Sequence, residues 1–487
     1  MCKELKMFYN TLEIDSTLRH MRLTKIICTL GPATNSLEGI QSLAESGMNI
    51  ARINFSHGTT DSHRTTIRTI QSVQRTGRCI AIMMDTKGSE IRTGDLAEPL
   101  SVKPGEEVLF SPLPLSNETL PVLQVNYAEF SQDVVDADRI LLDNGELSFE
   151  LVRVREDGVV VAKAREAGTI GSRRHINLPG ANVQLPSVTD KDWEDIAMGI
   201  EEGVDFVALS FIQTGNAVRE VKKFLRENGS TIQVISKIES KKAVENFDDI
   251  LEASDGIMVA RGDLGAEIPF ELVPAIQDDI VRRCREAGKP VIVATHMLES
   301  MTQHPMPTRA EATDVAHAAV TRSDCTMLSG ETAAGNNPLA SLDAMDRILR
   351  ETEKHLPMLA PGERVCAVSE YTARAQAAAI MALALQAPAI VVLTRTGRSA
   401  ESISQLRPTL PILALTDSEN VRRAMQILYG VLPLQIEFSD DPETTVEAAL
   451  QAIRSHGLVK SGQRIVIVSD TKTNTGLASS VQMRTMP

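Results

Sequence analysis

The chain from Lys25 to Glu331 repeats one pattern, in which a short apolar run ends in polar residues and is followed by an amphipathic helical stretch. Eight such runs occur, at KIICTLGP (25–32), NIARINFSHG (49–58), CIAIMMDTKG (79–88), DFVALSFI (205–212), QVISKIE (233–239), GIMVARGD (256–263), PVIVATHML (290–298) and CTMLSGE (325–331). Runs of this kind suit strands buried on both faces of a parallel sheet. Eight alternating units predict a (β/α)8 TIM barrel, whose active site lies at the carboxyl ends of the strands.

The third unit of the repeat is interrupted. From about Gly88 to Leu185 the helical periodicity disappears, and short alternating segments such as EEVLF, RILLD and GVVVAKA take its place, with turn residues between them. This pattern predicts a small β-barrel domain inserted over the mouth of the TIM barrel. A lid that excludes water is the functional interpretation, and an inert insertion is the alternative.

A third region begins after Leu356 and Pro357, where strands and helices alternate again, with strands expected at 389–394, 411–416, 431–436 and 464–469. The alternation predicts a doubly wound α/β domain. The expected division is therefore an N-terminal leader (1–21), a barrel in two parts (22–87 and 186–350), an inserted β lid domain (88–185) and a C-terminal α/β domain (351–487).

The fifth and sixth apolar runs carry the densest charge. Lys237 and Glu239 are two residues apart on one strand and therefore project from the same face. Asp263 closes the next run, so a lysine and two carboxylates are expected to meet if the strands are neighbours. Such a cluster is poorly stable without a cation between the acids. A salt-bridged strand end is the alternative, but polar residues close nearly every other run too: Arg52, Asn54, Ser56, Asp85, Thr86, Lys87, Ser210, Thr295 and Ser329.

The first strand of the C-terminal region leads into a polar loop and a helix start. The loop offers hydroxyls, guanidinium groups and unpaired helix N–H groups, and its residues are Thr394, Arg395, Thr396, Gly397, Arg398 and Ser399. Together these groups predict a phosphate cradle. Because it belongs to a different domain from the acidic cluster, we interpret it as an effector site; an ordinary strand-to-helix loop is the alternative.

Composition narrows the function classes. A net charge of -14 argues against general nucleic-acid binding. The six cysteines lie far apart without a CxxC pair, which favours buried thiols in a reducing cytoplasm. No apolar run reaches the ~18 residues that a membrane span needs, and residues 1–20 lack a signal-peptide core. A cytoplasmic enzyme that does not bind membranes is expected.

Several segments, taken in order across roughly residues 22–350, resemble the pyruvate kinase family. They are KIICTLGPAT, ARINFSHG, DTKGSEIRTG, NLPGANVQLP, SKIES, MVARGDLGAEIP, ATHMLESM and MLSGETAAG. The resemblance implies a barrel, a mobile lid and an effector domain, usually in a homotetramer. It also implies transfer of the phosphoryl group of phosphoenolpyruvate to ADP, giving pyruvate and ATP, with Mg²⁺ or Mn²⁺ and often K⁺.

The resemblance also implies residue roles. Lys237, Arg52, Thr295 and Ser329 would be catalytic. Substrate would contact Arg52, Lys237, Gly262, Asp263 and Thr295. Glu239 and Asp263 would hold the divalent metal. The K⁺ site would use Asn54, Ser56, Asp85, Thr86 and Ser210. The nucleotide would contact Arg92, Arg174, Asn54 and His57.

Two features refine the expectation, and two rivals remain. Glu90 matches family members that need K⁺, so K⁺ dependence is expected. The segment SDTKTNTGLASS (469–480) lacks the family's Gly/Pro-rich effector loop, which leaves a sugar phosphate, a nucleotide monophosphate or no effector at all.

One rival function is a metal-dependent lyase or aldolase acting on oxo acids, with Lys237 forming a Schiff base. The other is a catalytically silent sensor of phosphorylated metabolites.

Overall fold

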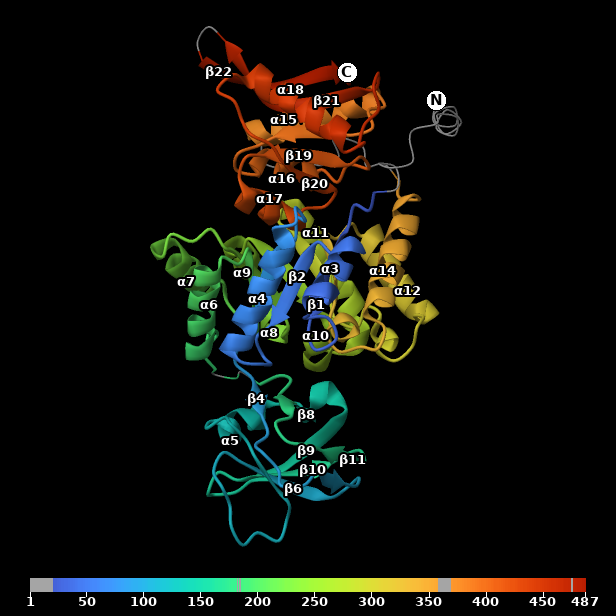
Figure 1. Ribbon diagram of the computed structural model, residues 1–487. Coiled ribbons are helices and arrows are strands. Elements are labelled where there is room, and N and C mark those ends of the chain that lie inside the picture. The colour runs from blue at the N-terminus through green and yellow to red at the C-terminus, as the bar shows by residue number, and fades with distance from the viewer. Residues whose placement is uncertain (1–20, 182, 184, 358–368, 474–475) are drawn as a thin grey trace.

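The computed structural model describes residues 21–181, 183, 185–357, 369–473 and 476–487. Three parts follow one another along its long dimension, with the C-terminal α/β domain at the top of Figure 1, the barrel in the middle and the β domain below. The expected leader falls almost wholly on residues 1–20, which lie outside the described residues. The limits of 88, 185 and 350 that we gave to the domains stay predictions.

The eight apolar runs form the eight strands of a closed parallel barrel, which confirms the predicted fold. Their order around the barrel is β1-β17-β16-β15-β14-β13-β3-β2. The strands are β1 (Lys25–Leu30), β2 (Ile50–Asn54), β3 (Ala81–Asp85), β13 (Phe206–Leu209), β14 (Gln233–Ile238), β15 (Gly256–Ala260), β16 (Val291–Ala294) and β17 (Cys325–Leu328). Closure by β1 against β17 brings both ends of the repeat to one place, with Lys25 opposite Cys325.

Helices cover the outside of this barrel. They are α3 (Leu37–Glu45), α4 (Thr60–Gln74), α6 (Asp190–Glu202), α7 (Gly215–Glu227), α8 (Lys241–Glu245), α9 (Phe247–Ala253), α10 (Arg261–Glu267), α11 (Val273–Ala287), α12 (Arg309–Val320), α13 (Gly330–Ala333) and α14 (Pro338–Glu353). A capping box between Thr189 and Asp192 starts α6, because each side chain accepts the other residue's backbone N–H. The helical stretch that follows the fifth apolar run is divided into two helices, α8 and α9, at Asn246.

Alternate residues of each barrel strand enter different cores. Ile26 and Cys28 of β1 pack outward among the helices, whereas Ile27 faces the barrel interior with Met83 and Met258. Both faces of each strand are therefore apolar, as the continuous runs in the sequence require. The polar positions are left to the strand ends.

The inserted segment is all-β apart from a short helix, α5 (Phe130–Asp133), and two 3-10 turns. One seven-stranded sheet has the order β4-β12-β8-β9-β10-β6-β7, and β11 pairs with β5 separately. These strands are β4 (Ile91–Arg92), β5 (Leu100–Val102), β6 (Glu107–Ser111), β7 (Val122–Gln124), β8 (Ile140–Leu142), β9 (Leu147–Val154), β10 (Val160–Ala164), β11 (Gly168–Ile170) and β12 (His175–Asn177). The side-chain amide of Asn177 donates a hydrogen bond of 2.9 Å to Glu267 of α10, which connects this domain to the barrel mouth.

The C-terminal domain has a five-stranded sheet in the order β20-β19-β18-β21-β22. Its elements are α15 (Glu370–Ala384), β18 (Ile390–Leu393), α16 (Arg398–Gln405), β19 (Ile412–Thr416), α17 (Glu419–Ala424), β20 (Val431–Gln435), α18 (Pro442–Ser455), β21 (Arg464–Thr473) and β22 (Gly476–Thr485). The four expected strands are present and parallel. The sequence prediction missed β22, which is antiparallel to β21.

This domain is fixed to the amino-terminal end of the barrel. Asp324, immediately before β17, forms an ion pair of 2.5 Å with Arg407, and both side chains are buried. The Lys25 ammonium donates a hydrogen bond of 2.5 Å to the carbonyl of Val431. The carboxyl ends of the strands are thereby left to the β domain (Figure 1). No helix among the described residues is long and apolar enough to cross a membrane.

Candidate active site

Lys237 lies at the centre of a buried polar cluster at the carboxyl ends of the barrel strands. Its Nζ lies 2.7 Å from Glu239 Oε1 and 3.1 Å from Asp85 Oδ1. It also donates a hydrogen bond of 2.7 Å to the hydroxyl of Ser210. Three neighbouring strands deliver these residues: β3 ends at Asp85, Ser210 directly follows β13, and β14 carries Lys237 near its end with Glu239 directly after it.

Arg52 closes the cluster on the side of β1 and β2. Its Nε donates to Asp85 Oδ2 at 2.7 Å, and Nη1 donates to the hydroxyl of Thr29 at 2.8 Å. Burial of Asp85 would raise the pKa of its carboxyl, but Arg52 and Lys237 outweigh burial and hold that pKa below its usual value. Asp85 is therefore a carboxylate that fixes two cations side by side.

Burial and charge act on Lys237 and Glu239 in opposite ways. Burial would lower the pKa of Lys237, yet Asp85 and Glu239 outweigh it and hold the pKa above the usual value. Burial raises the pKa of Glu239 to about 7; Lys237 opposes that rise and Asp263 adds to it. The cluster thus holds the Lys237 ammonium next to Glu239. The negative charge of Glu239 is only partly compensated by the cations around it.

Asp263 lies in the first turn of α10, directly after β15. β14 and β15 are paired neighbours, with Lys237 opposite Met258. Asp263 raises the pKa of Glu239, after the larger effect of burial, so the two carboxylates interact electrostatically. Two such acids, one buried, fit a hard divalent cation that takes few carboxylates and completes its coordination with substrate oxygens. A cage of three or more His, Cys, Asp or Glu ligands is absent from the described part of the chain.

Gly262 and Thr295 contact each other. The Gly262 N–H donates to Thr295 Oγ1 at 2.7 Å, and the Thr295 hydroxyl donates to the carbonyl of Ala294 at 2.6 Å. Ser329 follows β17, and its N–H donates to Glu331 at 2.7 Å. Its buried Oγ has no hydrogen-bond partner in the part of the chain that the structure describes. Thr295 and Ser329 therefore do not bond to the Lys237 cluster in this structure.

Oxygen atoms crowd the ends of β2 and β3. Asn54 lies opposite Asp85 in the register of these strands, and its side-chain oxygen accepts the N–H of Ser56 at 3.1 Å. Ser210 Oγ donates to the carbonyl of Thr86 at 2.7 Å. The five residues expected for K⁺ thus lie on adjacent strand ends, and each contributes oxygen.

Of the residues expected to contact nucleotide, Asn54 lies opposite Asp85, whereas Arg92, Arg174 and His57 make no bond to the cluster among the described residues. Arg92 of β4 pairs with Glu90 at 2.6 Å, and Arg174 pairs with Asp143 at 3.3 Å. His57 is exposed beyond β2. A cavity of about 380 Å³ between the β domain and the barrel mouth is lined by residues of both, Glu90 and Glu239 among them. The two arginines belong to the inserted domain, so its position decides how far they lie from Lys237.

The comparisons with known proteins all lead to one family. Residues 21–342 match the family model "Pyruvate kinase, barrel domain", and residues 372–482 match "Pyruvate kinase, alpha/beta domain". Plastidial pyruvate kinase 3 of Arabidopsis thaliana is 42% identical over 451 residues, covering 92% of this chain and 78% of the relative. A pyruvate kinase of Dictyostelium discoideum is 42% identical over 471 residues, covering 94% and 93%. A crystal structure of a pyruvate kinase from Cryptosporidium parvum superposes with a TM-score of 0.88 at 36% identity, covering 96% of each chain.

This chain belongs to the pyruvate kinase family. It is therefore an enzyme that transfers the phosphoryl group of phosphoenolpyruvate to ADP, as the sequence predicts. The lyase and silent-sensor interpretations are not supported by these relatives.

The loop 394–399, predicted to be a phosphate cradle, lines two different cavities. Thr394, Arg395, Thr396 and Ser399 line a cavity of about 410 Å³ within the C-terminal domain. Arg398 instead lines a larger cavity of about 880 Å³ between that domain and the barrel base, together with Gly397, Arg395 and Thr396. Arg395 is paired with Asp417 at 2.5 Å. The loop therefore separates two cavities.

Sequence reasoning missed three residues that bond to residues of the candidate site. Thr29 orients Arg52. Glu331 is fully buried and accepts the N–H groups of Leu298 and Ser329, which fixes the ends of two strands. Arg261 begins α10 and donates to the carbonyl of Thr295 at 2.7 Å. Arg261 and Glu331 stand in the MVARGD and MLSGE segments, so their position at strand ends was the available signal.

Proposed function

We propose that the phosphoryl transfer from phosphoenolpyruvate to ADP takes place at the Lys237 cluster, in the space between the barrel mouth and the inserted domain. The observation that carries this proposal is the buried Lys237 ammonium, 2.7 Å from Glu239 and held above its usual pKa beside Asp85. A permanent positive charge in a dry, prearranged site stabilises charge that develops on a transferring group.

Arg52 binds the phosphoryl group of the substrate in this proposal, and Lys237 contacts it during transfer. The forked guanidinium suits bidentate contact with phosphate oxygens. Arg52 keeps its Nη2 free for that purpose among the described residues, since the bonds to Asp85 and Thr29 use Nε and Nη1. Asp85 holds the two cations together, which lowers the entropy cost of forming the transition state.

Glu239 and Asp263 would hold Mg²⁺ or Mn²⁺. The acid pair supports this assignment because burial and Asp263 raise the pKa of Glu239, and a cation between them would relieve that repulsion. When bound, the divalent ion supplies Lewis-acid neutralisation of substrate oxygens. Lys237 and Arg52 would add positive charge beside the moving phosphoryl group, and the other residues of the chain would position the two substrates.

Gly262 and Thr295 would bind the substrate carboxylate. Their mutual hydrogen bond supports this role, because a carboxylate placed between them could accept from both donors once the Thr295 hydroxyl rotates away from Ala294. Ser329 would contribute to protonation of the enolate, through the hydroxyl that is buried near the end of β17.

The remaining ligands follow the same reasoning. K⁺ would bind among the oxygens of Asn54, Ser56, Asp85 and Thr86, with Ser210 joining them. The nucleotide would contact Asn54 and His57 on the barrel and the arginines Arg92 and Arg174 on the inserted domain. Both arginines are paired with acids in this structure, so ADP would take them over when the domain closes.

We also propose an effector site in the C-terminal domain, and a homotetramer. A sugar phosphate or nucleotide monophosphate would bind in the cavity lined by Thr394, Thr396 and Ser399, which is supported by hydroxyls beside the N-terminus of α16. Phe270, 81% exposed, is a large apolar side chain that a subunit interface could cover. We further propose that the enzyme acts in a reducing cytoplasm. This is supported by its free thiols, which are those of Cys28, Cys79, Cys284 and Cys325.

A coupled assay of pyruvate formation from phosphoenolpyruvate and ADP tests the proposal directly. Activity that requires a divalent ion and falls on mutation of Lys237 supports it. Borohydride trapping of Lys237 with an oxo acid would instead indicate the Schiff-base chemistry of a lyase or aldolase. Binding of phosphorylated ligands without turnover would indicate a sensor.

A further inference from the structure

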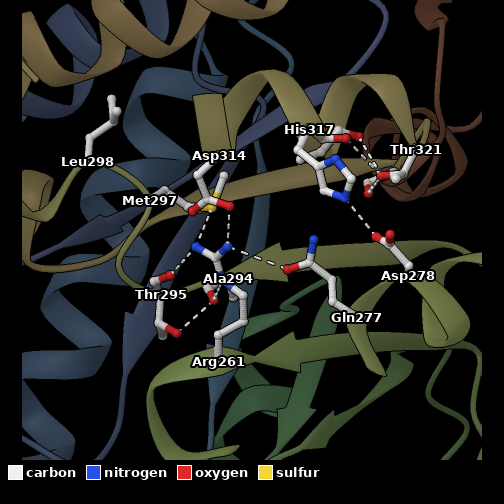
Figure 2. Close-up of polar contacts among 12 residues, drawn as sticks. Arg261, Gln277, Asp278, Ala294, Thr295, Met297, Leu298, Asp314, His317 and Thr321 are labelled. Atoms are coloured by element: carbon white, nitrogen blue, oxygen red, sulfur yellow. Dashed lines mark hydrogen bonds and ion pairs between the residues drawn. The ribbon is translucent and has the colours of Figure 1, made fainter. Parts of the chain in front are cut away.

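Arg261 is the first residue of α10 and directly precedes Gly262 and Asp263. Its side chain does not join the Lys237 cluster. It lies between α10, the turn that follows β16, and helices α11 and α12, as Figure 2 shows. The side chain is 11% exposed, so it is enclosed by protein rather than open to solvent.

All five N–H donors of the Arg261 guanidinium have a contact. On one side, Nη2 donates to the carbonyl of Thr295 at 2.7 Å and to the sulfur of Met297 at 2.9 Å, and Nε donates to the carbonyl of Ala294 at 3.3 Å. On the other side, Nη1 donates to Asp314 at 2.6 Å and to Gln277 at 3.4 Å. The arginine therefore joins the turn after β16 to two helices behind it (Figure 2).

The turn that Arg261 contacts is strained. Thr295 has a φ of 68° and His296 a φ of 52°, so two consecutive residues other than glycine adopt the left-handed conformation. That conformation is unfavourable for such residues, above all for β-branched threonine, and it persists only where the surroundings enforce it. The contacts of Arg261 with the carbonyls at both ends of the Thr295 residue supply such a restraint.

The same turn presents the Thr295 hydroxyl to the Gly262 N–H, at 2.7 Å. Arg261 thus fixes both partners of that pair, since it begins the helix that carries Gly262 and holds the backbone that carries Thr295. We propose that Arg261 is a positioning residue for the reaction: it holds the turn 294–297 in its left-handed form and so sets the groups that bind the substrate carboxylate. This inference rests on the proposed function of Gly262 and Thr295.

A direct role for Arg261 as an anion ligand does not fit these contacts. Asp314 neutralises its charge and no donor is left for a substrate. A direct ligand would also work whatever the backbone conformation of residue 296. A positioning residue becomes less necessary when that conformation is no longer strained. His296→Gly separates the two roles, because glycine adopts a positive φ without steric cost.

The test is a double-mutant cycle of Arg261→Met and His296→Gly, assayed by pyruvate formation. Arg261→Met is expected to lower kcat/KM for phosphoenolpyruvate by about 10- to 100-fold, as for a small misplacement of binding groups. The KM for ADP is expected to stay within about 2-fold, because Arg261 touches no group assigned to nucleotide. In the Arg261→Met background, His296→Gly is expected to restore about 5-fold or more.

Arg261→Lys and Asp314→Asn test the same role by milder changes, in case the Arg261→Met variant does not fold. The first keeps the charge without the fork, and the second keeps Arg261 but weakens its anchor, so both are expected to show smaller losses of the same kind. Arg282→Met is the matched control, because Arg282 also pairs with two carboxylates but on the exposed side of α11. We expect no change in kinetics from it.

Amide hydrogen exchange over residues 294–298 is the second readout. It is expected to accelerate in Arg261→Met and not in Arg282→Met. The inference is overturned if exchange is unchanged, if kcat/KM for phosphoenolpyruvate stays within about 2-fold of wild type, or if His296→Gly gives no recovery. If the wild-type enzyme forms no pyruvate, the proposed function fails instead, and the exchange measurement still decides whether Arg261 holds the turn.

Discussion

Replacement of Lys237 by methionine is the strongest test of the proposed chemistry. Methionine keeps most of the length of the side chain and removes the charge. Lys237 Nζ contacts Glu239 at 2.7 Å, Asp85 at 3.1 Å and Ser210 at 2.7 Å. The change therefore removes one positive charge at contact distance from the place where the phosphoryl group moves, while Arg52 still pairs with Asp85.

The expected loss follows from that distance. Two unit charges about 3 Å apart interact by about 5 kcal/mol at an effective dielectric constant of ~20. Since each factor of ten in rate corresponds to about 1.4 kcal/mol, kcat is expected to fall by about 10³- to 10⁵-fold. The same range applies to a cationic side chain that neutralises a transferring phosphoryl group in other enzymes. Folding is expected to weaken by about 3–5 kcal/mol, because Glu239 loses its buried partner.

Steady-state kinetics with the coupled assay, together with Mn²⁺ binding followed by electron paramagnetic resonance, measure the two effects separately. Mn²⁺ is expected to bind still, since Glu239 and Asp263 remain. Lys223→Met is the control, because that lysine is 69% exposed and has only a 3.8 Å contact with Glu227. A folded Lys237→Met enzyme that keeps more than about a tenth of wild-type kcat would refute the assigned role.

Three further predictions concern other parts of the molecule. Because of Glu90, activity in buffer free of K⁺ and Na⁺ is expected to be small and to return when K⁺ is added. Burial raises the pKa of Asp205 to about 6, although an arginine pairs with it, so the folded state resists its ionisation. The stability of the wild type relative to Asp205→Asn should therefore fall by about 2 kcal/mol from pH 4 to pH 7, as measured by urea unfolding. Arg407→Met is expected to cost about 3–5 kcal/mol, because it leaves the buried Asp324 carboxylate without its cation, with only the N–H groups of Val291 and Tyr429 as donors among the described residues.

Each of these predictions has an outcome that contradicts it. Full turnover without K⁺ would refute the K⁺ site. A difference between wild type and Asp205→Asn that does not vary with pH would show that Asp205 titrates normally. Arg347→Met is the control for the third, because its pair with Asp343 is exposed and worth less than about 1 kcal/mol. Equal losses in the two arginine variants would contradict the special cost of the buried pair.

The barrel was predictable because each strand is buried on both faces and therefore appears in the sequence as a continuous apolar run. The residues that close those runs were predictable for the same reason: only at the ends of such strands can charge reach a ligand. The strand β22 was missed although residues 481–485 alternate apolar and polar side chains. The predicted alternation of strands and helices ends at 469, and an antiparallel strand formed by the chain turning back on β21 is not part of that alternation.

Contacts between different strands were the part that sequence could not supply. The spacing of Lys237 and Glu239 fixes a common face, but nothing in it predicts that Ser210 and Asp85 complete the cluster. Those contacts depend on which strands are neighbours and on their stagger around the closed barrel. The left-handed turn at Thr295 was equally hidden, since no glycine marks it.

Arg52 and Arg261 show most clearly why a residue type at a strand end does not determine its role. Arg52 lies inside the strand β2, Arg261 directly follows β15, and both are mostly buried. Arg52 shares Asp85 with Lys237 and keeps donors for a ligand, whereas Arg261 uses every donor on the protein and is neutralised by Asp314. Their partners separate them. The carboxylate that pairs with Arg52 also holds the Lys237 ammonium that we propose as catalytic, so Arg52 is expected to face the reaction. The carboxylate that pairs with Arg261 stands on α12 behind the site, so Arg261 is expected to support it. The double-mutant cycle at His296 is informative because it asks which of these two descriptions the kinetics obey.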